Sequence, residues 1–135
     1  MKTLIVEDDF TSRLLLQSIL SRYGECHVAV DGEEAIEAFR RGWVESDPYD
    51  LICMDIMMPR LDGDTALAAI RHEEEQRGIA PGDGVKIIMT TALRDKSHVF
   101  GAFRKNCDAY LFKPLDKVKL LSHLMSFGLI ESIST

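Results

Sequence analysis

The sequence predicts an α/β fold in which five helices cover both faces of a doubly wound, five-stranded parallel sheet. Four short runs are apolar on both faces, as expected of strands buried between layers of helices. Segments with a helical hydrophobic period separate these runs, so strand and helix alternate along the 135-residue chain. The length and the hydrophobic content of 46% suit one globular domain.

The expected strands differ in how apolar they are. Four runs are uniformly apolar, whereas the run at residues 26–30 is mixed, which predicts a place for it at the edge of the sheet. The apolar runs occupy residues 3–6, 51–54, 86–89 and 109–112.

Each expected helix carries apolar residues on one face. The first spans residues 11–22, and the other four follow an aspartate whose carboxylate can accept hydrogen bonds from first-turn N–H groups. These expected N-caps are Asp31, Asp64, Asp95 and Asp116. Asn106 and Gly128 are expected to end the last two helices, because both residue types tolerate a left-handed backbone.

Composition excludes several classes of protein. The formal charge of −6 argues against nucleic-acid binding, which needs a cationic surface. Three widely spaced cysteines indicate reduced thiols, and neither a signal peptide nor a membrane-spanning apolar stretch is present. We therefore expect a soluble, cytoplasmic protein without a membrane partner. Residues 94–119 hold seven basic and three acidic residues, which makes them a candidate surface for an acidic protein partner.

Charged and hydroxyl side chains follow the apolar runs. In an open α/β sheet, ligands bind outside the carboxyl ends of the strands, so these side chains should converge there. They are Glu7, Asp8 and Asp9 after the first run, Asp55 after the third, Thr90 and Thr91 after the fourth, and Lys113 after the last. Clustered carboxylates repel one another unless a cation neutralises them, and Mg²⁺ suits such oxygen ligands beside a phosphate. Lysine and threonine supply hydrogen-bond donors for that phosphate.

The motifs that contain these residues resemble those of the response-regulator receiver domains of two-component signalling. They read LIVEDD at residues 4–9, MDIMMP at 54–59 with DG at 62–63, MTTA at 89–92 and DAYLFKP at 108–114. The resemblance implies a flavodoxin-like strand order of 2-1-3-4-5. It also implies that Asp55 accepts a phosphoryl group from a sensor histidine kinase or a histidine phosphotransfer protein.

The resemblance further implies roles for the converging residues. Asp8 and Asp55 would bind Mg²⁺ directly, Glu7 would bind it through water, and the Met57 backbone carbonyl would complete the protein ligands. Mn²⁺ is a possible substitute for Mg²⁺.

Three more residues would act on the phosphoryl group or respond to it. Lys113 and Thr91 would each contact a phosphate oxygen, and Thr91 and Tyr110 would switch position on phosphorylation. Met57 and Leu93 are apolar where a polar side chain could orient water, so we expect slow loss of the phosphoryl group.

The expected protein is a stand-alone response regulator of the kind found in chemotaxis. Residues 1–128 would form the receiver domain and residues 129–135 a short tail, without an output domain. It would be a monomer or weak dimer that binds an unidentified downstream protein, and its only catalysis would be its own phosphotransfer and slow autodephosphorylation. The alternatives are a phosphorelay intermediate and a binding module that is never phosphorylated. A phosphatase is disfavoured, because Met57 stands where that mechanism needs a second acid.

Overall fold

The structure of the protein is a computed structural model that describes residues 1–92 and 106–133. The strands are β1 (Lys2–Val6), β2 (Glu25–Ala29), β3 (Leu51–Asp55), β4 (Lys86–Ala92) and β5 (Ala109–Lys113). The α-helices within these ranges are α1 (Phe10–Leu20), α2 (Gly32–Val44), α3 (Gly63–Gln76) and α5 (Lys117–Ser126), and a 3₁₀ turn, η1, covers Ser21–Tyr23. The helix expected after Asp95 lies outside the described residues.

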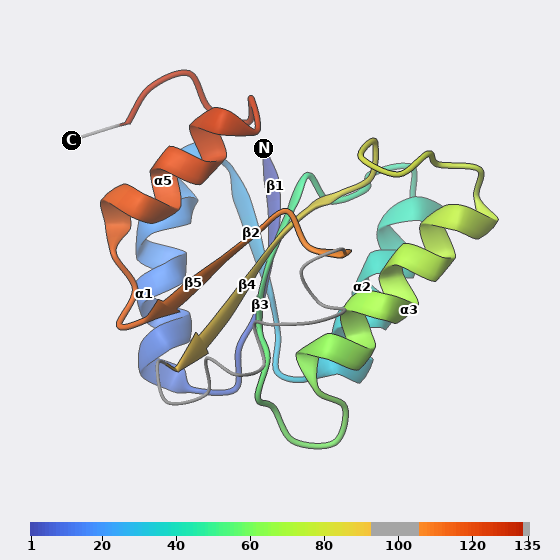
Figure 1. The fold of residues 1–135 in the computed structure, drawn as a ribbon, viewed down its shortest axis with the longest axis horizontal. Helices are drawn as coiled ribbons and strands as arrows, with labels where there is room; N and C mark the ends of the chain where they lie inside the picture. Colours follow the sequence, from blue (N-terminus) through green and yellow to red (C-terminus); the bar gives the residue numbers. More distant parts are fainter. Residues whose placement is uncertain (93–105, 134–135) are drawn as a thin grey trace.

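The five strands form one parallel sheet in the order β2-β1-β3-β4-β5, which confirms the predicted fold class and the edge position of β2. Figure 1 shows α1 and α5 on one face of the sheet and α2 and α3 on the other. Because all strand pairs are parallel, the carboxyl ends of the strands meet at one edge of the sheet, the lower edge in Figure 1.

The sheet has a hydrophobic core on each face. Along β1, Leu4 and Val6 pack on the side of α2 and α3, whereas Ile5 packs on the side of α1 and α5. Met54 and Cys53 divide β3 between the two cores in the same way. The helices contribute Phe39, Leu67 and Ile70 to the first core and Leu16, Leu20 and Leu120 to the second. This alternation explains why the central strands are apolar at every position.

The helix caps agree in part with the sequence prediction. Asp31 and Asp116 cap α2 and α5 as expected, and Gly128 follows α5 with a φ of 77°. The predicted cap Asp64 is wrong, because Asp62 caps α3 by accepting a hydrogen bond from the Thr65 amide at 2.9 Å.

Gly63 explains why α3 begins two residues earlier than the sequence prediction. A Cβ atom at Gly63 would lie 2.2 Å from the carbonyl oxygen of Asp55. Only glycine can therefore start a helix this close to the end of β3. Asp64 falls inside the first turn as a result.

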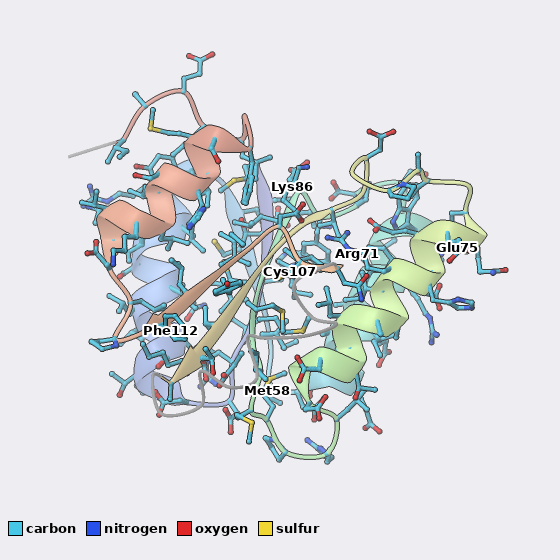
Figure 2. The ribbon with its side chains drawn as sticks, viewed as in Figure 1. Met58, Arg71, Glu75, Lys86, Cys107 and Phe112 are labelled. Carbon is cyan, nitrogen blue, oxygen red and sulfur yellow. The ribbon has the colours of Figure 1, made fainter. Side chains whose placement is uncertain are left out.

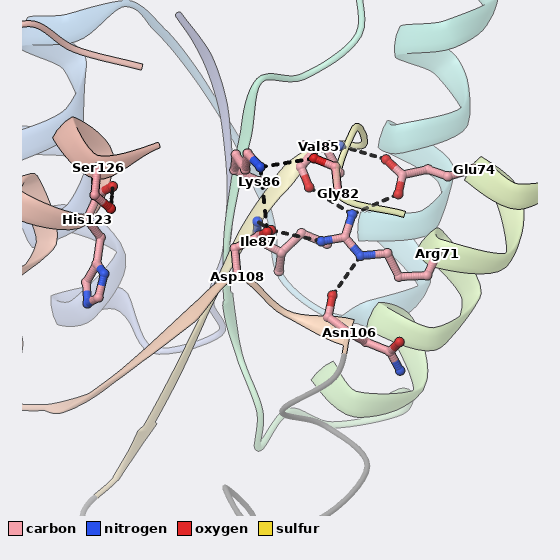
Figure 3. A network of polar contacts seen from close by, with 10 residues as sticks. All are labelled: Arg71, Glu74, Gly82, Val85, Lys86, Ile87, Asn106, Asp108, His123 and Ser126. Atoms are coloured by element: carbon pink, nitrogen blue, oxygen red, sulfur yellow. Dashed lines mark hydrogen bonds and ion pairs between the residues drawn. The ribbon is translucent and has the colours of Figure 1, made fainter. Parts of the chain in front are cut away.

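Arg71 of α3 joins the starts of β4 and β5 at the edge of the sheet opposite the converging carboxylates (Figure 3). Its guanidinium donates to the carboxylates of Glu74 and Asp108, at 2.7 and 2.9 Å, and to the backbone carbonyls of Val85 and Asn106, at 2.8 and 2.7 Å. The carboxylate of Glu74 also accepts a hydrogen bond from the Val85 amide at 2.6 Å. One side chain thus fastens a helix to two strands.

Two further expectations concern the whole chain. The three cysteines are free thiols, as predicted. Among the helices that the structure describes, none has the length and hydrophobicity that a membrane span requires.

Candidate functional site

The predicted acidic residues meet at the carboxyl edge of the sheet. Glu7 directly follows β1 and Asp55 ends β3, and these two strands are neighbours with Val6 opposite Met54. Carboxylate oxygens of Glu7, Asp8 and Asp55 all lie within 4.8 Å of one another. Glu7 and Asp55 are buried, whereas Asp8 is exposed to solvent. Asp8 is thus the member of the cluster that is accessible to solvent.

Lys113, the last residue of β5, reaches across to this cluster. Its Nζ lies 2.9 Å from Oε2 of Glu7 and 3.2 Å from Oδ2 of Asp55. Burial lowers the pKa of Lys113, but the hydrogen bond to Glu7 and the charge of Asp55 outweigh this effect, so the pKa is raised overall. The ammonium group therefore stays charged beside two carboxylates.

The carboxyl group of Glu7 has a raised pKa. Burial raises its pKa to about 7, although the hydrogen bond from Lys113 opposes this rise, and the charge of Asp55 raises the pKa further. Three carboxylates lie beside the single ammonium group of Lys113, so the cluster has excess negative charge when all three are ionised. Hard oxygen ligands with excess negative charge fit a divalent cation such as Mg²⁺, which prefers carboxylates and retained waters.

Asp9, which was predicted to converge with the other acidic residues, lies outside the cluster. Its carboxylate accepts a hydrogen bond from the Ser12 amide at 2.9 Å and caps α1, and this bond lowers the pKa of Asp9. The sequence prediction missed this cap, although an aspartate directly before a helical period is the signal for one. Arg13 donates to the Glu7 carbonyl at 3.2 Å and fastens the first turn of α1 to the end of β1.

The loop after β3 borders the same carboxylates. The Met57 amide lies 3.3 Å from Oδ1 of Asp55 and donates to it, while the Ile56 amide donates to the Thr90 carbonyl at 3.0 Å. The Met57 side chain is 51% exposed. In Figure 2, Met58 and Phe112 mark this end of the sheet, and Arg71 and Lys86 lie towards the other end.

Thr91 lies inside a strand rather than after one. The sequence prediction ended the fourth strand at residue 89, but β4 continues to Ala92, because Thr90 and Thr91 pair with residues of β5. Thr91 is buried, and its hydroxyl donates to the Ala92 carbonyl at 3.4 Å rather than to a carboxylate of the site.

Tyr110 is the second residue of β5 and lies opposite Met89. Its partly buried ring packs against the core on the side of α2 and α3, and it makes an edge-to-face contact with Phe112 at 6.1 Å between ring centroids. Leu93 and residues 94–105 of the basic segment 94–119 lie outside the described residues.

The parallel sheet between two layers of helices places the chain in the class of doubly wound α/β proteins, with three carboxylates and a lysine at the carboxyl edge. Within that class, the sequence profile of the response regulator receiver domain matches residues 3–125. The chemotaxis protein CheY of Treponema pallidum is 32% identical over 93% of this chain and 81% of its own length. The chain belongs to the family of response regulator receiver domains. It is thus a CheY-like receiver domain of two-component signalling, a family of signalling phosphoacceptors rather than of conventional enzymes.

Solved structures agree with this assignment. The receiver domain of a sensor histidine kinase from Pseudomonas aeruginosa, solved with a magnesium ion in its active-site cleft, is 27% identical with a TM-score of 0.75, over 94% of this chain and 97% of that chain. A chain of the CheX–CheY–BeF₃–Mg complex from Borrelia burgdorferi is 29% identical with a TM-score of 0.76, over 93% and 87%.

Other relatives in sequence are longer proteins. The probable transcriptional regulator ycf27 of Porphyridium aerugineum is 32% identical over 93% of this chain, which spans only 47% of that relative. The sensor histidine kinase GacS of Pseudomonas protegens is 32% identical over 88% of this chain, which spans 12% of that kinase.

Proposed function

We propose that this protein accepts a phosphoryl group on Asp55 in a Mg²⁺-dependent reaction and signals through a protein-binding surface that changes on phosphorylation. The donor is a sensor histidine kinase or a histidine phosphotransfer protein. The observation that carries the proposal is the convergence of Glu7, Asp8 and Asp55 with Lys113 at one edge of the sheet. Membership of the receiver family supports the same reading.

The metal ligands in this proposal are the residues of the acidic cluster. Asp8 and Asp55 would bind Mg²⁺ directly, Glu7 would bind it through a water molecule, and the Met57 carbonyl would be the remaining protein ligand. Bound Mg²⁺ supplies the positive charge that lets an anionic carboxylate meet an anionic phosphoryl group.

Asp55 is the nucleophile of the transfer step. One of its carboxylate oxygens forms a bond to phosphorus while the P–N bond to the donor histidine breaks, and the departing imidazole takes up a proton. Lys113 already lies 3.2 Å from the Asp55 carboxylate, so its ammonium group can pair with a phosphoryl oxygen without a long displacement. The phosphoryl group of the product carries about two negative charges. Because the charge of the Asp55 carboxylate is lost when the acyl phosphate forms, the end of β3 gains about one net negative charge.

Thr91 and Tyr110 link this new charge to the surface. The Thr91 hydroxyl, which now donates to a neighbouring carbonyl, turns to a phosphoryl oxygen. The space that it leaves is available to the ring of Tyr110, whose position then reports the state of Asp55. Hydrolysis of the aspartyl phosphate ends the signal slowly.

Uptake of radiolabel from acetyl phosphate tests the proposal. The wild-type chain with Mg²⁺ should become labelled, whereas wild type with EDTA and Asp55→Ala with Mg²⁺ should not. Asp83→Ala, which removes an exposed aspartate in the loop before β4, is the matched control and should be labelled normally. An unlabelled wild type would favour the pure binding module, and label retained in Asp55→Ala would exclude Asp55 as the acceptor.

A phosphorelay intermediate is the second candidate, because the chain matches a sensor histidine kinase as well as CheY. A relay protein would pass its label to a histidine phosphotransfer protein faster than to water. A terminal regulator would lose the label mainly by hydrolysis. Following both products over time separates the two functions.

A further inference from the structure

Arg60 has an unusual backbone conformation close to the candidate site. It lies in the loop between β3 and α3, five residues after Asp55, and its φ is +64°. This left-handed region is uncommon for a residue with a long side chain and is normally filled by glycine or asparagine. Arg60 therefore adopts a backbone conformation that its residue type rarely takes, in the loop that follows Asp55.

The side chain of Arg60 forms an ion pair with a buried carboxylate. Its Nη2 lies 2.7 Å from Oδ2 of Asp31, whose side chain is only 1% exposed. The other carboxylate oxygen of Asp31 accepts a hydrogen bond from the Glu34 amide at 2.9 Å and caps α2. One buried aspartate thus holds the start of a helix with one oxygen and the loop after β3 with the other.

The backbone joins the same two segments. The Gly32 amide donates to the Leu61 carbonyl at 2.9 Å, and a Cβ atom at Gly32 would lie 2.6 Å from that oxygen. At the far end of the loop, the Gly63 amide donates to the Ile56 carbonyl at 2.8 Å. The loop therefore contacts the start of α2 directly through its backbone, and Arg60 adds an ion pair to Asp31.

We propose that Arg60 is a positioning residue for the metal and phosphoryl site. Its ion pair with Asp31 holds the loop in the conformation that presents the Met57 carbonyl and the Asp55 carboxylate. The inference rests on the proposed function, since it assigns the loop a part in Mg²⁺ binding. Removing a group that orients metal ligands commonly weakens metal affinity by 10- to 100-fold.

Arg60→Asn isolates the ion pair from the backbone preference. Asparagine tolerates the left-handed conformation but cannot reach Asp31. We expect the Kd for Mg²⁺, measured by titration calorimetry on the folded full chain, to rise about tenfold. Arg60→Lys keeps a positive charge and should recover part of the affinity. Asp31→Asn keeps an N-cap of similar quality, loses the ion pair, and should weaken Mg²⁺ binding to a similar extent.

Arg40→Ala is the matched control. Arg40 joins α2 to α3 through an ion pair with Glu73 at 2.6 Å, and its side chain is exposed to a similar extent, 57% against 64% for Arg60. Because this pair does not touch the loop, its loss should leave the Kd for Mg²⁺ unchanged.

The outcomes separate this inference from the proposed function. A wild-type chain that binds no Mg²⁺ would contradict the proposed function itself. Wild-type binding with an unchanged Kd in Arg60→Asn would overturn the inference, even if the variant unfolds more easily, because the pair would then only stabilise the fold. A double variant of Asp31→Asn and Arg60→Asn that is no weaker than either single variant would support it, whereas additive losses would count against it.

Discussion

The carboxylate of Glu7 makes the stability of the protein depend on pH in an unusual direction. Its pKa is raised from 4.5 to about 7, mainly by burial. Between these values the folded chain retains a proton that the unfolded chain has lost. Raising the pH through this window therefore lowers the free energy of unfolding by way of Glu7, and the loss levels off above pH 7. Most carboxylates act in the opposite direction.

Glu7→Gln tests this prediction in the absence of metal. Glutamine resembles the protonated acid, so the variant should be about as stable as wild type at pH 5 and more stable at pH 8. Urea unfolding in EDTA at both values gives the comparison. A stability difference that does not grow between pH 5 and pH 8 would contradict the raised pKa of Glu7.

Met57 is the residue on which the lifetime of the phosphorylated state should depend. Its side chain is half exposed beside Asp55 and offers no polar atom that would orient an attacking water molecule. Met57→Asn supplies such an atom, so we expect the aspartyl phosphate to decay several-fold faster. Decay of radiolabel at fixed Mg²⁺ measures this rate.

Met125→Asn is the control for this variant. Met125 is also exposed, at 41%, but it lies on α5 away from Asp55. Its decay rate should match that of wild type. An equal or slower decay in Met57→Asn would show that the apolar side chain does not protect the phosphoryl group.

The sequence was sufficient to predict most of the side chains that converge, because the ends of parallel strands meet at one edge of the sheet, although Asp9 caps α1 instead. Glu7, Asp55 and Lys113 follow from that rule alone. Arg60 does not, since its pairing with Asp31 depends on how one loop packs against a helix that begins 28 residues earlier in the chain. No local pattern encodes that contact.

At the scale of elements, the hydrogen bonds and ion pairs of Arg71, called the Arg71 network here, attach α3 to the sheet. The Arg71 side chain is 21% exposed and that of Glu74 is 6% exposed, so both charges are largely withdrawn from water. Arg71→Met would leave Glu74 and Asp108 without their shared cation at the starts of two strands. We expect the free energy of unfolding to fall by about 2–3 kcal/mol, measured by urea denaturation.

Arg41→Met is the corresponding surface control. Arg41 pairs with Glu37 at 3.3 Å on α2, and both side chains are about two-thirds exposed. Such a pair contributes at most about 0.5 kcal/mol. Similar losses in the two variants would mean that the Arg71 network adds no more than an exposed ion pair.

The elements themselves were predictable where hydrophobic patterning decides them. The strand order and the edge position of β2 followed from apolar runs and from the resemblance in motifs. The errors lie at boundaries: β4 extends to Ala92 and α3 begins at Gly63. In both places tertiary contact overrides local signals, through pairing with β5 in one case and through close packing on Asp55 in the other.

At the scale of the whole molecule, the acidic edge couples metal binding to folding. Three carboxylates lie within 4.8 Å of one another, and this arrangement exists only in the folded chain. Mg²⁺ should therefore bind the folded state selectively and stabilise it. Above the Kd, each tenfold increase in free Mg²⁺ should add about 1.4 kcal/mol to the free energy of unfolding at constant ionic strength.

Asp8→Asn and Asp9→Asn distinguish a specific site from general charge screening. Both variants remove one negative charge at neighbouring positions, and asparagine still caps α1 in the second. Asp8→Asn removes a proposed metal ligand, so its stability should respond only weakly to Mg²⁺, whereas Asp9→Asn should respond as wild type does. Urea denaturation across a Mg²⁺ series measures both. If the two variants respond alike, the ion acts by screening the acidic edge, and the assignment of Asp8 as a ligand fails.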